Sequence, residues 1–210
     1  MNELAEIDQA ERVKKWCREY GVGIIAGVIF AIIVSMGWRY WQQRQENNLI
    51  LASMEYQNLL DASNQENHTA FDTMANTIIQ NYSKTPYALL AALQLAKQAV
   101  NQNKLVAAEK QLVWIIQHGK SGTLRAVART RLARVLLAEN QPERALKVLD
   151  ENDNTAYHPL TLEEKGDIYL YLGHPSEALQ NYLAAEKFFS KSAIEQPLLS
   201  MKINNLTGSV

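Results

Sequence analysis

An uncharged stretch near the N-terminus, residues 21–38 (GVGIIAGVIFAIIVSMGW), constrains this chain more than any other feature. A helix of that length, rising about 1.5 Å per residue, reaches about 27 Å, close to the hydrocarbon thickness of a bilayer. Aromatic residues flank the stretch on both sides: Trp16, Tyr20, Trp38, Tyr40 and Trp41. Such rings settle at the headgroup level of a membrane. The pattern therefore predicts a single transmembrane helix, which we place at residues 21–41.

A cleavable signal peptide is the main alternative, because Ser35 and Gly37 are small and lie two residues apart. The apolar run is longer than a usual signal core, however, and residues 38–41 (WRYW) resemble an interface anchor. A buried core helix is the second alternative. No other segment is apolar enough to surround such a helix, so the membrane-spanning interpretation is favoured.

The cations near the two ends of this stretch predict its orientation, because Lys and Arg are enriched on the cytoplasmic side. The N-terminal side carries Arg12, Lys14, Lys15 and Arg18, and the C-terminal side carries Arg39 and Arg44. We therefore expect a cytoplasmic tail (residues 1–20) and an exported domain (residues 42–210). The formal net charge of −1 gives no case for nucleic acid as a partner. The single cysteine, Cys17, excludes an internal disulfide.

Small residues recur at a spacing of four within the apolar stretch, on one face of the predicted helix: Gly23, Gly27, Ala31 and Ser35. Small residues allow a second membrane helix to approach closely, so this face predicts helix packing. The partner is either a second copy of the chain or another membrane protein. Glycine is also common in membrane helices without any packing role, and this alternative stays open.

A repeat begins near Thr85 and is clearest in its last unit, where the spacing of small and aromatic residues matches the tetratricopeptide pattern. The repeat signature consists of Ala96, Ala108, Ala133, Ala145, Gly166, Tyr169, Gly173, Ala178 and Tyr182. Proline follows Thr85, Gln141 and His174, which predicts the start of a helix at each position. Residues 42–62 and 69–82 are expected to form helices, and residues 188–206 to form a closing helical region with a break near Pro197. The fold class is therefore all-α: one transmembrane helix followed by a TPR-like α-solenoid of helical hairpins.

The first helices of stacked hairpins line a common face, which predicts a protein-binding groove. Carrying over the usual groove-facing positions gives Leu90, Leu93, Lys97, Val127, Thr130, Arg134, Asp167 and Leu170. These form an apolar surface with a few charges, which suits an extended polypeptide that Lys97 and Arg134 would orient. The alternative is that the same residues are covered by the C-terminal segment or buried between repeats. Arg125, Arg129, Arg131 and Arg134 also make one helix basic. A solvated face is the simplest account of these arginines, and docking of an acidic partner is the alternative.

The sequence offers no arrangement of residues that predicts catalysis. The four histidines stand singly near predicted turns, and no spacing of His, Cys, Asp or Glu suits a metal ion. Glu163, Glu164 and Asp167 lie close together in the sequence, as acidic residues often do on ordinary surface helices. Thr161 with Glu164 predicts a capping box at the start of a helix. We therefore expect no enzymatic activity, no cofactor and no metal.

The chain resembles the ancillary SecYEG translocon subunit family of Gram-negative bacteria. The resemblance lies in residues 37–41 (GWRYW) at the end of the apolar stretch, 56–58 (YQN), 132–135 (LARV) and the closing 201–206 (MKINNL). It implies a non-catalytic protein of the bacterial inner membrane that associates with the SecYEG translocon and with the periplasmic chaperone PpiD. Such a protein would help exported client polypeptides reach periplasmic chaperones.

Two functions therefore follow as expectations. The first is a membrane-anchored interaction protein that joins the export machinery to periplasmic chaperones. The second is a regulator of an envelope stress response, acting on a cytoplasmic stress-response regulator through residues 1–20. The family resemblance implies both, and the tail's lack of a folded module favours the first.

Overall fold

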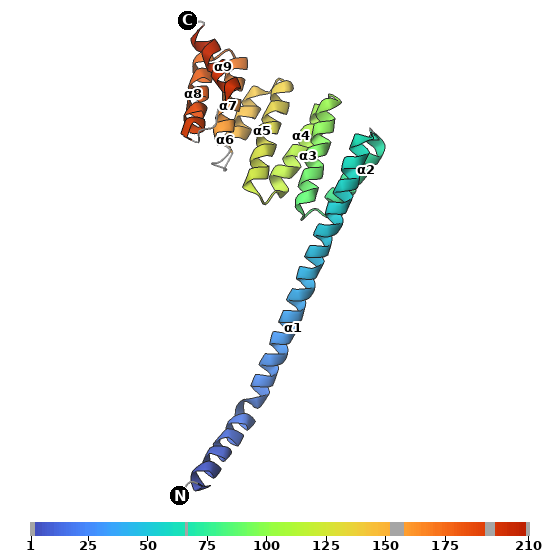
Figure 1. Cartoon of the computed structure of the whole chain (residues 1–210), viewed down its shortest axis with the longest axis vertical. Helices are drawn as coiled ribbons and strands as arrows, with labels where there is room; N and C mark the ends of the chain where they lie inside the picture. Colours follow the sequence, from blue (N-terminus) through green and yellow to red (C-terminus); the bar gives the residue numbers. More distant parts are fainter. Residues whose placement is uncertain (1–2, 66, 152–157, 192–195, 209–210) are drawn as a thin grey trace. The chain divides into compact units, whose positions relative to one another are not determined.

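The computed structural model describes residues 3–65, 67–151, 158–191 and 196–208 (Figure 1). Within α1 the side chains of residues 3–19, 21, 22, 24, 25 and 28 lie outside the description, as does that of residue 191. Every regular element of the described residues is an α-helix, so the all-α expectation is confirmed. The chain divides into two units, Met1–Ile50 and Leu51–Val210, and each is considered by itself.

The first unit consists of most of α1 (Glu3–Asn64), a helix that continues into the second unit. From Glu3 onward, the predicted tail and the predicted membrane span therefore form one continuous helix. From Ile29 to Trp41 the described apolar side chains are exposed, and the rings of Trp38 and Trp41 lie 5.5 Å apart between their centroids. The backbone here is helical, as predicted, and the helix carries its large apolar groups on the outside.

The predicted transmembrane helix itself is not confirmed. No helix among the described residues combines the length and the apolar character that crossing a membrane requires. Residues 21, 22, 24, 25 and 28 of the predicted span, four of them Val or Ile, have side chains outside the description.

The second unit contains the end of α1 and eight further helices within the described residues. These are α2 (His68–Asn81), α3 (Pro86–Asn101), α4 (Leu105–His118), α5 (Gly122–Ala138), α6 (Pro142–Asp150), α7 (His158–Tyr171), α8 (Pro175–Lys191) and α9 (Pro197–Thr207). From α2 onward each helix packs against the next, and α3, α5 and α7 also contact one another in turn (Figure 1). This arrangement of successive hairpins is the TPR-like repeat that the sequence predicts.

The turn inside each of three hairpins has the same backbone geometry. Asn103, Asn140 and Gly173 have positive φ angles of 56°, 59° and 76°. In each hairpin the next residue donates its N–H to a carbonyl five residues back, as Lys104 does to Ala99. This bond satisfies a carbonyl that the end of the helix leaves free. Each of the three turns therefore has a residue that tolerates the left-handed region at the same position. Asparagine takes the place of glycine in two of them.

Small residues allow the two helices of a hairpin to touch. A Cβ added to Gly166 of α7 would lie 2.3 Å from the ring of Tyr182 on α8, so only glycine fits there. Ala96 and Ala133 lie at the equivalent positions of α3 and α5 and are buried. The remaining signature alanines, one each on α4, α6 and α8, are fully buried: Ala108, Ala145 and Ala178.

The predicted helix starts agree with the observed helix bounds except in α7. Proline begins α3, α6 and α8, as its missing N–H allows, and α9 also starts at a proline, Pro197. The predicted capping box is wrong, because α7 already begins at His158 and Thr161 therefore lies inside the helix. Thr161 and Glu164 are both buried.

Candidate functional site

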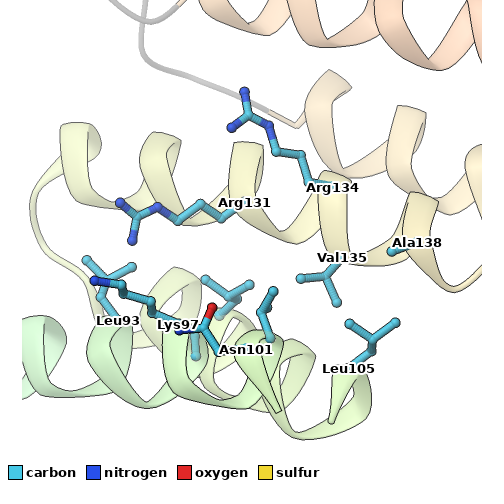
Figure 2. Close-up of a pocket in the computed structure, with 11 residues that line it drawn as sticks. Leu93, Lys97, Asn101, Leu105, Arg131, Arg134, Val135 and Ala138 are labelled. Atoms are coloured by element: carbon cyan, nitrogen blue, oxygen red, sulfur yellow. The ribbon is translucent and has the colours of Figure 1, made fainter. Parts of the chain in front are cut away.

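A pocket of about 300 Å³ opens between α3, α4 and α5 (Figure 2). Its floor is apolar: Ala96 of α3, Leu112 of α4 and Val135 of α5 are each at most 5% exposed. Leu93 and Leu105 extend the apolar lining to the two sides of the view in Figure 2. A volume of this order is at the lower end of the range for ligand sites and suits one or two side chains of a partner.

Cations complete the pocket lining, and no acidic residue of the described part joins them. Lys97 comes from α3, whereas Arg131 and Arg134 come from α5. Figure 2 shows the side chains of Lys97 and Arg131 directed toward the same end of the pocket, beside Leu93, whereas the guanidinium of Arg134 turns away from Lys97. Two cations from neighbouring hairpins therefore converge on the mouth of an apolar pocket.

Arg134 pairs with a buried carboxylate of the next hairpin. Its Nε donates to Oε2 of Glu164 on α7 at 2.7 Å, and Glu164 is 4% exposed. Burial raises the pKa of Glu164 above its ordinary value, and the hydrogen bond and charge of Arg134 oppose that rise. Arg134 thus helps to hold α5 against α7.

A second set of charges joins the last three helices. Lys202 of α9 donates from Nζ to Oε1 of Glu163 and to Oδ2 of Asp167, at 2.8 Å each. The hydroxyl of Tyr182, on α8, donates to Oδ1 of Asp167 at 2.6 Å. Burial and this hydrogen bond raise the pKa of Tyr182. Burial lowers the pKa of Lys202, but its bonds to Asp167 and Glu163 outweigh that effect and the pKa is raised.

Comparison with known proteins places these features in a family. The tetratricopeptide repeat-like domain family matches residues 14–208. The ancillary SecYEG translocon subunit of Escherichia coli (strain K12) is 32% identical over 202 residues, which cover 96% of this chain and 97% of that protein. The chain belongs to the ancillary SecYEG translocon subunit family. The resemblance seen in the sequence motifs is therefore confirmed.

Other members of the family give the same result. The ancillary SecYEG translocon subunit of Haemophilus influenzae is 30% identical over 203 residues, covering 97% of this chain and 98% of that protein. The subunit of Aggregatibacter actinomycetemcomitans is 31% identical with the same coverage. No solved structure matches the chain significantly. The family model matches residues 14–208, so the pocket and the charged cluster lie within the matched region.

The structure places the predicted groove residues of this family member in different surroundings, and their role in binding stays a prediction. Leu93, Lys97 and Arg134 line the pocket. Leu90, Val127 and Thr130 are half-buried on α3 and α5 outside the pocket lining, Asp167 belongs to the charged cluster with Lys202, and Leu170 is exposed on α7. Of the positions carried over from the repeat pattern, three therefore line the pocket, one belongs to the charged cluster, and four belong to neither.

Sequence reasoning left Arg131 and Leu105 out of the groove. Arg131 lies three residues before Arg134, which brings both onto the same side of α5. Leu105 reaches the pocket because the turn at Asn103 directs the start of α4 back toward α3. The spacing of Arg131 and Arg134 was a signal in the sequence, whereas the position of Leu105 required the turn geometry.

The predicted membrane packing face remains a prediction. Gly23, Gly27, Ala31 and Ser35 are exposed on α1, and a Cβ added to either glycine would meet no atom within 4 Å. Their spacing of four in a continuous helix places them on one side of it, as the sequence predicts. Within the described residues, no three His, Cys, Asp or Glu side chains are grouped so as to hold a metal ion.

Proposed function

We propose that this chain is a non-catalytic, membrane-anchored interaction protein that associates with the SecYEG translocon and helps pass exported polypeptides to periplasmic chaperones. A PpiD-like chaperone is the expected partner for that transfer. The observation that carries the proposal is the family match, since relatives named ancillary SecYEG translocon subunits align over nearly the whole chain. The TPR-like second unit supports it, because stacked hairpins commonly provide surfaces for binding other proteins.

A membrane anchor near residues 21–41 is part of the proposal. Residues 29–41 of α1 expose Ile29, Phe30, Ile33 and Trp38, each more than half exposed, and a contiguous apolar surface of this kind is unfavourable in water. A lipid environment would remove that cost, and Arg39 beside Trp38 would lie at the interface. Under this proposal residues 1–20 are cytoplasmic and residues 42–210 are periplasmic, in the bacterial inner membrane.

The charges of the second unit support a structural rather than a catalytic use. Lys202 of α9 donates to both Glu163 and Asp167 of α7, and Arg134 of α5 donates to Glu164 of α7. Each group thereby joins neighbouring helices of the solenoid. Ion pairs of this kind stabilise an architecture, and the family's name describes an ancillary role.

Co-purification from membranes tests the translocon association. The full-length, tagged chain would be purified in a mild detergent, and SecYEG would be measured in the eluate. The control is the same tag on an unrelated single-span membrane protein. We expect SecYEG to co-purify with this chain and not with the control, and failure to recover it above the control level would contradict the association.

The anchor and the topology need separate measurements. We expect the chain to stay in the membrane fraction after alkaline carbonate extraction, and protease added to spheroplasts to digest residues 42–210. Release by carbonate would contradict the anchor, and protection of the second unit would contradict the orientation.

The tail is the site of a second candidate role, control of a cytoplasmic stress-response regulator. α1 begins at Glu3, so the described part of the tail is helical. Deleting residues 1–19 separates the two roles. We expect translocon association to persist in the deletion variant while any effect on the stress response is lost; an unchanged stress response would remove the regulatory role.

A further inference from the structure

We propose that the pocket between α3, α4 and α5 binds an extended polypeptide segment in which an acidic side chain lies two residues from a large apolar side chain. The inference rests on the proposed function, since it specifies which segments of a polypeptide the second unit selects. The apolar floor would take the apolar side chain, and Lys97 with Arg131 would hold the carboxylate.

The apolar half of the proposal follows from the lining. Ala96, Leu112 and Val135 are buried beneath the pocket, so a side chain that enters it loses its contact with water against apolar atoms only. Leu93 and Leu105 extend the same surface. An aliphatic or aromatic side chain of a partner gains the most from such a site, because the free energy gained scales with the apolar area removed from water.

The charged half follows from the contrast between neighbouring cations. Arg134 is bound to Glu164, but neither Lys97 nor Arg131 makes an ion pair with any described residue. Both are exposed, and Figure 2 shows them directed to the same end of the pocket. Two like charges held near one another repel, so an anion placed between them gains attraction from both and relieves that repulsion.

The spacing follows from helix and strand geometry. The lining residues of α3 run from Leu93 to Asn101, a stretch of nine residues that rises about 12 Å along the helix. An extended chain advances about 3.3 Å per residue, and its side chains alternate between two faces. Residues two apart therefore share a face and lie about 7 Å from one another, which lets both reach the pocket at once. Adjacent residues point to opposite faces and would leave one contact unmade.

The size of the pocket favours a polypeptide over an anionic lipid. About 300 Å³ accepts side chains, whereas a long acyl chain would extend beyond the buried floor and leave much of its apolar surface in water. The acidic group is assigned to a side chain within the segment, because a chain in transit through a translocon presents internal segments before its C-terminus is free.

Labelled peptides and the full-length chain in detergent micelles test the proposal by fluorescence anisotropy. The test peptide carries Leu-Ser-Glu in a glycine and serine context with both ends blocked. Peptides with Leu-Ser-Gln, Leu-Glu-Ser and Leu-Ser-Lys are the comparisons, and a peptide ending in a free carboxylate after Leu-Ser tests the other source of the charge. Wild type should bind Leu-Ser-Glu at least about tenfold more tightly than each comparison peptide.

Charge reversal supplies the decisive variant. Lys97→Glu with Arg131→Glu should lose that preference and instead bind the Leu-Ser-Lys peptide most tightly, a gain that an unfolded protein could not show. Both residues are exposed, so the helices should be retained in circular dichroism. The matched control reverses two exposed lysines outside the pocket, Lys147→Glu with Lys187→Glu, and should alter affinity less than about twofold.

Several outcomes would overturn the proposal. Equal affinity of wild type for the Leu-Ser-Glu and Leu-Ser-Gln peptides would remove the charge recognition, and preference for the free C-terminal carboxylate would reject an internal acidic residue. If the charge reversal altered only the capture of phosphatidylglycerol vesicles and left peptide binding unchanged, the cations would serve a lipid surface. If any of these results were obtained while SecYEG still co-purified with wild type, the proposed function would stand and only this inference would be rejected.

Discussion

The two charged regions of the second unit differ in how completely their charges are balanced. In the C-terminal cluster, Glu163, Glu164 and Asp167 of α7 meet Lys202 from α9 and Arg134 from α5. In the pocket, Lys97 and Arg131 approach the same apolar floor without an acidic residue among the described lining. The cluster is satisfied within the chain, whereas the pocket presents charge that the fold itself does not use.

Burial explains why the chain balances one region and not the other. Glu164 is 4% exposed, and a buried carboxylate without a partner would be strongly unfavourable, so Arg134 is required beside it. Lys97 and Arg131 remain in contact with water, which screens their repulsion. In this chain the balanced charges hold helices together, whereas the proposed binding site uses the exposed cations Lys97 and Arg131, which the fold leaves without an ion pair among the described residues.

The largest expected effect is in the C-terminal charged cluster, at the buried side chain of Tyr182. Tyr182→Ala removes a fully buried ring between α7 and α9 and should lower the free energy of unfolding by about 3–5 kcal/mol, measured by urea denaturation. Tyr182→Phe keeps the ring and removes only the hydrogen bond to Asp167, so it should cost about 1 kcal/mol. Equal losses in the two variants would mean that the cluster depends on the hydroxyl rather than on packing.

A smaller loss is expected from the glycine that faces this ring. Gly166→Ala places a methyl group 2.3 Å from the Tyr182 ring and should lower stability by about 1–3 kcal/mol, although alanine favours the helix itself. In a Tyr182→Ala background the collision is absent, so the same change should be neutral or stabilising. A double-mutant cycle measures this coupling, and simple additivity would contradict the contact.

The repeat was predictable from the sequence because its packing depends on residue size at fixed intervals. Ala96, Ala133 and Gly166 recur where helices must touch, and prolines mark helix starts, so local chemistry and period agree. The turns were only partly predictable. Asn103 and Asn140 adopt the conformation that Gly173 signals directly, and asparagine is a weaker sign of it.

The site was less predictable because it depends on contacts between hairpins. Arg134 appeared to be a ligand-orienting residue, but its partner Glu164 lies 30 residues away and nothing in the spacing selects that pairing. Glu163, Glu164 and Asp167 likewise read as ordinary surface acids until α9 brought Lys202 beside them. Periodicity locates a face of a helix, whereas the partner across that face is fixed by the packing of the whole unit.

The pH dependence of stability should distinguish the buried carboxylate from the exposed cations. Because burial raises the pKa of Glu164, the folded chain holds its proton more tightly than the unfolded chain does. The stability that protonated Glu164 contributes is therefore lost as the pH rises from its ordinary pKa of 4.5 through its raised pKa in the folded chain. Glu164→Gln cannot ionise, so its unfolding free energy should fall less than that of wild type over this interval. Parallel pH profiles would contradict the assignment.

The smallest effect should come from the pocket, where the fold does not use the charge. Arg131→Gln removes the positive charge beside Lys97 and so relieves the repulsion between the two cations. It should raise the free energy of unfolding slightly, by about 0.5 kcal/mol or less. Added salt should reduce the gain, because it screens the repulsion that the substitution relieves. Arg134→Gln is the matched change three residues away and should lower stability, since it leaves Glu164 buried without its partner. Urea denaturation at low and high salt measures both variants; a marked loss of stability in Arg131→Gln would show that this cation, too, holds the helices together.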